Sequence, residues 1–163
     1  MNYRCSNCDA TARKVRTNYP FKESGLSNVI LKGIETIQCD RCGNADPVIP
    51  RANEVMKQLV LAVVEKPHGL TGQEIRFLRK YLGMNGPTFA SHLGVDRSVL
   101  SRWENGHDRI GPQSDRLIRM VATSLGGLKN QVEQVARKFT MIENDPKTLM
   151  IEINVEELSY QYA

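Results

Sequence analysis

The chain has 163 residues, of which 40% are hydrophobic and 25% charged, and a formal net charge of +4. This composition is typical of a soluble globular protein and excludes a disordered or fibrous one. The longest apolar run, residues 59–64, is far shorter than the roughly 20 residues that a membrane span needs. The first residues lack the apolar core of a signal peptide, so we expect a cytoplasmic protein without membrane contacts.

Four cysteines form two C-x-x-C pairs, Cys5 with Cys8 and Cys39 with Cys42. Both sulfurs of such a pair can reach one cation, and two pairs complete the tetrahedral all-sulfur site that suits Zn²⁺. A catalytic zinc keeps one coordination position open, so a closed four-cysteine site indicates a structural ion. We therefore predict structural zinc as the cofactor. Iron in a rubredoxin-like site, a redox dithiol and disulfides stay open as alternatives.

Residues 1–50 are predicted to form a small, β-rich zinc-binding domain. Segments 12–17 and 29–37 are β-prone, with turn-forming residues between them. Gly43 fits a metal-binding turn because glycine tolerates a positive φ. So small a unit buries little apolar surface, and we expect the metal to supply most of its folding free energy. Chelation should then unfold residues 1–50 and leave the next domain standing.

A linker with a connecting helix is expected over residues 51–70. The preceding segment, 46–50, contains two prolines and is itself expected to be a linker, and apolar residues then recur at helical spacing within 53–66. Two interpretations of this helix stay open. It packs on one of the two flanking domains, or it serves as a dimerisation or hinge helix.

Residues 71–125 are predicted to form an all-α bundle. The segment holds eight basic and five acidic side chains, a net charge of +3. Residues 1–50 have a net charge of +2, which a divalent metal on four thiolates would bring to zero, so residues 71–125 are then the only clearly basic part and the first place to look for phosphate contacts. Glycines and prolines mark the helix ends. In chain order the signals are a Thr71–Glu74 capping box, Pro87 at the first position of a helix, Gly94 at a turn, Asp96 capping a helix over 97–105, and Pro112 starting a helix with Leu117, Ile118, Val121 and Leu125 on its apolar face.

The run PTFASHLGVDRSVLSRWENG, residues 87–106, resembles the Xre/Cro-type helix-turn-helix family. It departs from the family in one place, where a glutamine that is common early on the second helix is replaced by Pro87 or Thr88. We expect Trp103 to lie in the core and Glu104 to pair with a nearby arginine. The residues that match the family pattern are Ala90, Leu93, Gly94, Val95, Ser101, Arg102, Trp103, Glu104 and Gly106.

The polar residues of the expected recognition helix are the candidate DNA contacts. A helix of this length fits the major groove with its first residues toward base edges. Arg102 is the leading candidate for a bidentate contact with guanine. Thr88 and Arg109 are expected at phosphates. The full set of predicted DNA-binding residues is Arg97, Ser98, Ser101, Arg102, Thr88 and Arg109.

Residues 126–163 are expected to add a C-terminal helix and a strand used for dimerisation or partner contact. Apolar residues share one helix face over 128–139, and apolar and polar residues alternate over 149–155. A lone strand needs a partner, which is the zinc domain's own sheet, a symmetry mate or another protein. With a net charge of −2, this segment is a poor candidate for DNA contact.

The whole chain resembles the MqsA-type antitoxins, also described as YgiT-type zinc finger proteins with a helix-turn-helix. The resemblance rests on the two cysteine pairs and on Ser101-Arg102-Trp103. It implies a dimer that represses its own operon through its helical half. It also implies that the zinc half binds a small ribonuclease toxin. Ser98 and Arg102 fall at base-reading positions of that family.

A homodimer also follows from DNA geometry, because one helix-turn-helix reads too few base pairs, and a palindromic operator is therefore expected. The β-rich first segment and the helical second segment together predict an α+β protein.

Two other functions were weighed against the antitoxin. A stand-alone zinc-containing transcriptional regulator with no toxin partner is the alternative that the same residues allow. An enzyme is disfavoured, because the metal site is closed and no catalytic constellation of carboxylates, cysteine or histidine is evident.

Overall fold

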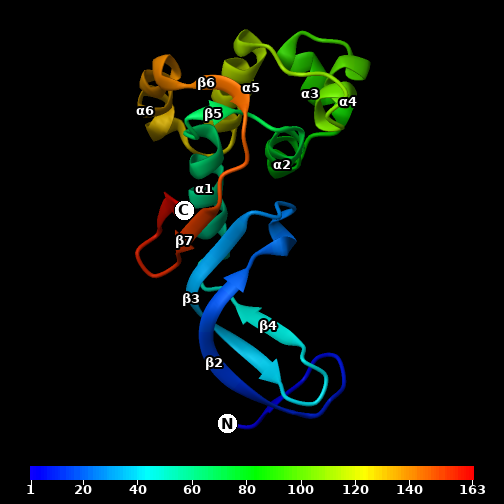
Figure 1. Ribbon diagram of the computed structural model, residues 1–163, viewed down its shortest axis with the longest axis vertical. Coiled ribbons are helices and arrows are strands. Elements are labelled where there is room, and N and C mark those ends of the chain that lie inside the picture. The colour runs from blue at the N-terminus through cyan, green and yellow to red at the C-terminus, as the bar shows by residue number, and fades with distance from the viewer.

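Helices gather at one end of an elongated molecule, and a long β-hairpin reaches to the other end, where the N-terminus lies (Figure 1). The computed structural model describes residues 1–163. No helix is long and apolar enough to cross a membrane. The helices are α1 (Ala52–Val64), α2 (Gly72–Tyr81), α3 (Gly86–Leu93), α4 (Arg97–Glu104), α5 (Pro112–Leu125) and α6 (Val132–Arg137), with short 3-10 turns η1 (Lys22–Ser24), η2 (Lys129–Gln131) and η3 (Lys138–Met141).

The strands form one six-stranded sheet and one small two-stranded sheet. The long antiparallel hairpin of β2 and β3 is the central part of the larger sheet. At the end near the N-terminus, β1 pairs with β2. On the other side of β3, β4 pairs with residues 35–38 and β7 pairs in parallel with residues 29–32. The strands are β1 (Tyr3–Arg4), β2 (Thr11–Pro20), β3 (Val29–Cys39), β4 (Ala45–Val48), β5 (His68–Gly69), β6 (Glu143–Pro146), β7 (Ile151–Asn154) and β8 (Ser159–Tyr162).

The C-terminal strand finds its partner within the chain. Of the three partners considered, β7 takes the sheet of the N-terminal segment, and β8 continues that sheet as an antiparallel edge strand. Residues 46–50 were expected to be a linker, and that expectation is wrong for the first part, since β4 runs from Ala45 to Val48. Pro47 is tolerated there because β4 lies at a sheet edge, where a missing N–H costs little.

An irregularity divides the hairpin into two halves. The register between β2 and β3 shifts between Thr17 and Tyr19. Opposite this point Gly33 has φ +62°, and its N–H donates to the Asn18 Oδ1 at 3.0 Å. Glycine is favoured at such a bulge because the left-handed region is strained for other residues. The half before the bulge carries the cysteines, and the half beyond it belongs to the main core.

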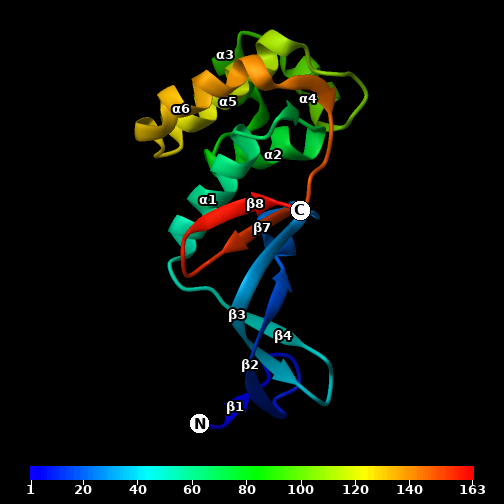
Figure 2. The ribbon, with the colours of Figure 1, turned by 60° about the vertical axis from the view of Figure 1, so that its left-hand side comes forward.

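The main core contains 29 buried residues and spans the inner half of the sheet and the helices. Helix α1 lies between the two, against β7 and β8 on one side and α5 on the other (Figure 2). All six residues from Leu59 to Val64 are buried, as expected for a helix that is covered all round. The connecting helix therefore contacts both parts of the molecule rather than packing on one of them.

The helix ends of the bundle follow the local sequence signals closely. Thr71 and Glu74 form the predicted capping box, and Asp96 accepts from the Ser98 N–H at the start of α4. Gly94 ends α3 with φ +65°. One detail differs: Asn85 caps α3, so that Pro87 is the second helical residue rather than the first. Both positions precede the first intrahelical N–H donor, so proline is accepted at either.

The buried face of α5 is only in part the one that its apolar residues predicted. Ile118 was expected in the core and is fully buried, but Leu117 and Leu125, also expected there, are 40% and 54% exposed. Ala122 is fully buried although it was not predicted. The helix is rotated because its inner face also carries three buried polar side chains that bond to neighbouring backbone and to each other. These side chains are Asp115, Arg119 and Thr123.

Candidate functional site

The four cysteines meet at the far end of the hairpin. Their Sγ atoms all lie within 4.8 Å of one another, with 3.5 Å between Cys5 and Cys42 and 3.6 Å between Cys8 and Cys39. A tetrahedral ion with metal–sulfur bonds of about 2.3 Å would place its sulfurs about 3.8 Å apart. The cluster therefore has the dimensions of a four-sulfur metal site, as the spacing of the cysteines predicted.

The two cysteine turns share one backbone geometry. In each, the carbonyl of the first cysteine accepts an N–H from the residue four positions later, Asp9 or Gly43, at 3.0 Å. The N–H of Cys5 and of Cys39 donates to the carbonyl five positions later at 2.9 Å. Asp9 and Gly43 both have a positive φ, +55° and +75°. Gly43 was predicted in this role, whereas Asp9 was not, because aspartate reaches this region less often than glycine.

The thiols of the cluster differ in acidity. The pKa of Cys42 is lowered to about 6, chiefly by the N–H of Asn44. For Cys8 a hydrogen bond from the Ala10 backbone acts to lower the pKa, but desolvation and the neighbouring thiols raise it to about 12. Four sulfurs this close do not all ionise by themselves, since each thiolate opposes the next. A cation is what would allow all four to become thiolates, so the donor set fits a metal ion.

At the opposite end of the molecule, helix α4 has an apolar face and a polar face. Leu100 and Trp103 are buried against the bundle, as expected for Trp103. Four of the predicted DNA-binding residues lie on α4, and all six are exposed. The four are Arg97, Ser98, Ser101 and Arg102; Thr88 lies in the first turn of α3, and Arg109 follows α4 in the loop to α5.

Hydrogen bonds within the chain already engage five of these six residues, all except Arg97. The N–H and the hydroxyl of Ser98 both donate to Asp96 Oδ1 at 2.8 Å, and the Ser101 hydroxyl accepts from Asn105 Nδ2 at 3.3 Å. Arg102 forms a two-pronged ion pair with Asp108, and Arg109 pairs with Asp145 in β6. The backbone N–H of Thr88 donates to the cap residue Asn85 at 2.9 Å. Its hydroxyl is therefore the group of Thr88 that is left for a ligand.

Helix α4 is fixed against α2 by Glu104. This carboxylate accepts from Arg79 Nε at 2.6 Å and from Arg79 Nη2 at 3.0 Å, and Arg76 lies 3.5 Å away. The arginine partner predicted for Glu104 is therefore present. Because the glutamate side chain is only 8% exposed, the pair holds the two helices in one relative position.

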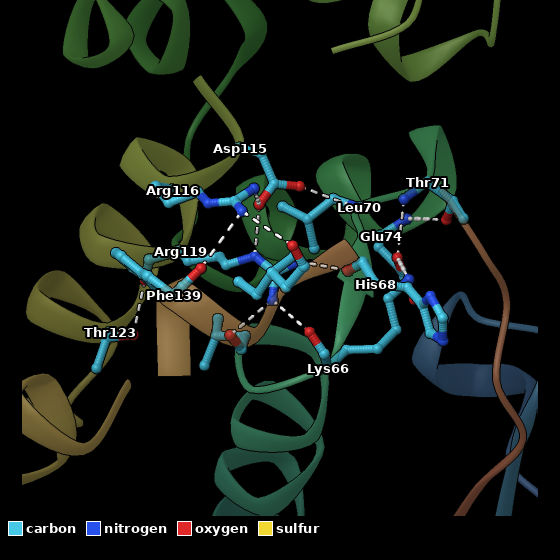
Figure 3. A network of polar contacts seen from close by, with 12 residues as sticks. Lys66, His68, Leu70, Thr71, Glu74, Asp115, Arg116, Arg119, Thr123 and Phe139 are labelled. Carbon is cyan, nitrogen blue, oxygen red and sulfur yellow. Dashed lines mark hydrogen bonds and ion pairs between the residues drawn. The ribbon is translucent and has the colours of Figure 1, made fainter. Parts of the chain in front are cut away.

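A buried ion network that the sequence analysis missed lies where α1 ends (Figure 3). Arg119 binds Asp115 at 2.7 Å and donates to three backbone carbonyls, those of Val64, Lys66 and His68. Lys66 Nζ lies 2.5 Å from Glu74 Oε2, and burial lowers the pKa of this lysine. The network connects α1, α2 and α5.

One signal in the sequence could have revealed half of this network. Asp115 and Arg119 are four positions apart, the spacing at which opposite charges face each other on a helix. Nothing in the local pattern indicates that Lys66 and Glu74 meet, since they come from different elements. Glu74 Oε1 is buried and has no hydrogen-bond partner in the protein.

No protein-family model matches the chain, and no curated protein matches it. Function is therefore inferred from the residues and their geometry.

Proposed function

We propose that the chain is a sequence-specific DNA-binding protein that represses transcription by placing α4 in the major groove. The observation that carries the proposal is the pair α3 and α4, joined by a short turn at Gly94 and followed by an exposed polar face on α4. These helices belong to the only clearly basic segment, residues 71–125. Their sequence is the one that resembles the Xre/Cro-type helix-turn-helix.

The dimensions of α4 suit this role. An α-helix with its side chains is about 10–12 Å across, which matches the ~12 Å width of the major groove, and the eight residues of α4 give it about two turns to place there. Arg97 and Ser98 lie in its first turn, where base edges are usually read. Arg102 lies one turn further and would reach a guanine. Thr88, on the neighbouring α3, would contact the phosphate backbone through its hydroxyl.

One such helix reads only a few base pairs, so the proposed binding unit is a homodimer. Two copies related by a two-fold axis would place their α4 helices in successive major grooves, about 34 Å apart. The operator would then be a palindrome with half-sites one helical turn apart. The repressor would act in the cytoplasm, where this DNA lies.

The metal held by the four cysteines is proposed to be zinc in a structural role. Cys5, Cys8, Cys39 and Cys42 would be its ligands. The bound ion would neutralise the thiolates and cross-link the two cysteine turns. With four cysteine ligands the ion would have no open coordination position for a substrate, and it would not contact the DNA.

A toxin partner is the second part of the proposal and rests on the resemblance to MqsA-type antitoxins. That resemblance implies that the cysteine end would bind a small ribonuclease toxin and that the helical end would bind the operator. The structure separates these ends along the long axis of the molecule, which would allow both partners to bind at once (Figure 1). The alternative is a stand-alone regulator, in which the cysteine end has no toxin partner.

Two assays on the full, metal-loaded chain test these proposals separately. In a mobility-shift assay at low ionic strength we expect specific binding to the chain's own upstream region, and failure on every fragment of it would contradict the DNA-binding proposal. Coexpression with the adjacent gene, followed by size measurement, should yield a complex. DNA binding without such a complex would favour the stand-alone regulator.

A further inference from the structure

The Asp108 carboxylate forms a two-pronged ion pair with Arg102, the leading candidate for a base contact. Asp108 Oδ2 accepts from Arg102 Nε at 2.5 Å, and Asp108 Oδ1 accepts from Arg102 Nη2 at 3.0 Å. The arginine and aspartate side chains are 57% and 45% exposed. An exposed arginine normally samples many rotamers, and a two-pronged contact of this kind restricts them.

The backbone after α4 holds Asp108 in position. Gly106 takes φ +71° and turns the chain back over the end of the helix. The Arg102 carbonyl then accepts from the N–H of His107 at 2.9 Å and from the N–H of Asp108 at 3.3 Å. Asp108 is therefore anchored to the same residue that its side chain binds. The pair is a local unit of the fold rather than a chance contact between two long surface chains.

The contact leaves the reading end of Arg102 free. A guanidinium has five N–H donors. Asp108 takes the donor on Nε and one on Nη2, along one side of the group. Both donors on Nη1 and the second on Nη2 remain, and these form the end-on pair that matches guanine O6 and N7.

We propose that Asp108 is a positioning residue for DNA reading, which fixes the Arg102 guanidinium so that its free edge meets a guanine. The inference rests on the proposed DNA-binding function and adds a specificity-determining residue to it. Arg102 would touch the base, and Asp108 would act only through Arg102. The gain is in selectivity, because a guanidinium already held in one orientation loses less freedom when it meets the correct base.

The charge of Asp108 makes the inference testable. The Arg102 guanidinium holds the pKa of the Asp108 carboxyl below its usual range, with His107 adding to the effect, so the carboxylate is ionised at neutral pH. A negative charge beside the DNA-facing helix repels phosphates and weakens binding to DNA of any sequence. Removing it should therefore help non-specific binding while harming base selection. If the contact with Asp108 merely kept Arg102 away from the DNA, its loss would instead sharpen base selection.

The experiment is selection from a pool of random duplex DNA with the full, metal-loaded chain. Asp108→Ala is compared with Asp108→Asn, which keeps the size and one acceptor oxygen, and with Arg102→Ala. Glu133→Gln is the matched control, because it removes an exposed carboxylate that pairs with an arginine, Arg137, as Asp108 does, but that lies on α6 and not beside α4. Fluorescence of the buried Trp103 checks that each variant is folded.

We expect the wild-type chain and Glu133→Gln to select the same guanine. Asp108→Ala should lower that preference by about 5- to 10-fold and bind random DNA at least as tightly as the wild type, Asp108→Asn should fall between, and Arg102→Ala should lose the preference. If Asp108→Ala keeps or sharpens the preference that Arg102→Ala loses, this inference is overturned while the proposed function stands. If the wild-type chain selects no sequence, both are overturned.

Discussion

The two ends of the molecule differ in what holds them together. At the end that carries the four cysteines, only Cys5, Ala12 and Cys39 form a separate buried cluster, and two of these are proposed metal ligands. The helical end shares a core of 29 buried residues and adds the ion network of Arg119 and its partners. We therefore expect the cysteine end to need a bound metal ion for its stability, whereas the helical end is stabilised by packing and buried polar bonds.

This difference also limits the part of the chain that we expect to unfold when the metal is removed. The sequence led us to expect that all of residues 1–50 would unfold on chelation. In the structure, however, Phe21, Val29 and Leu31 belong to the main core, beyond the bulge at Gly33. The dependence on metal should therefore stop at the bulge and spare the inner half of the hairpin.

The largest expected effect is that of metal removal. Chelation under reducing conditions should abolish amide protection in residues 3–16 and 35–48, because the bound metal contributes about 10 kcal/mol or more to such sites. Protection in α1 and in the inner sheet should survive. Hydrogen exchange read by mass spectrometry measures both regions in one sample.

Cys39→Ser should reproduce the effect of chelation. Arg41→Ala is the matched control, since Arg41 is exposed and lies between two ligands without being one. A uniform loss of protection along the whole chain would contradict the division at Gly33, and unchanged protection in 3–16 would contradict a structural metal.

The next largest effect concerns the helical end. Arg119→Met should lower the free energy of unfolding by about 3–5 kcal/mol, because it leaves the buried Asp115 carboxylate with only Arg116, at 3.5 Å, as a charge partner and removes the donor to three backbone carbonyls. Urea denaturation followed by helical circular dichroism measures this. Arg137→Ala, which breaks an exposed pair with Glu133, should cost about 1 kcal/mol or less. Equal effects of the two variants would show that the buried network does not hold the bundle together.

A smaller effect is expected on binding. Arg102→Ala should weaken binding to the selected operator by about 1–3 kcal/mol and relax one base position, with the metal content and folding unchanged. Fluorescence anisotropy on operator variants measures this. An equal loss on all sequences would instead identify Arg102 as a phosphate contact.

The smallest effect is on pH dependence. The N–H of Ser98, followed by its hydroxyl, lowers the pKa of Asp96, the cap of α4. The folded chain therefore binds this proton less readily than the unfolded chain. The resulting stabilisation is present above the ordinary aspartate pKa of about 4 and is lost as the pH falls through the lower folded value.

The variant Asp96→Asn tests whether the charge of Asp96 stabilises α4 above pH 4. Asp96→Asn keeps a capping oxygen without a charge, so the acid-induced loosening of α4 should become weaker. Amide shifts of residues 97–104, followed between pH 5 and pH 2 by NMR, report it. Identical titrations of the two proteins would show that Asp96 does not contribute to the pH dependence of α4.

What could be predicted from the sequence was mainly local. The cysteine spacing predicted a single cluster, and the cap at Asp96 and the turn at Gly94 lie where the local signals put them. Each signal involves residues a few positions apart, whose geometry the backbone fixes directly.

What was missed involves contacts between distant segments. The apolar spacing of Leu117 and Leu125 favoured a face of α5 that a buried ion network displaced. The pairing of β8 with β7, and the meeting of Lys66 with Glu74, depend on how the elements pack and leave no local pattern. Short strands such as β5 and β6 are two and four residues long and give too little periodicity to detect.

The most direct measurement of the central proposal uses an operator in which 7-deazaguanine replaces the guanine assigned to Arg102. This base lacks the major-groove N7 acceptor and keeps Watson–Crick pairing. We expect the replacement to weaken binding of the wild-type chain and to have no further effect on Arg102→Ala, because the same contact is lost in both. An equal loss in the two proteins, or no loss in either, would show that Arg102 of α4 does not read this guanine in the major groove.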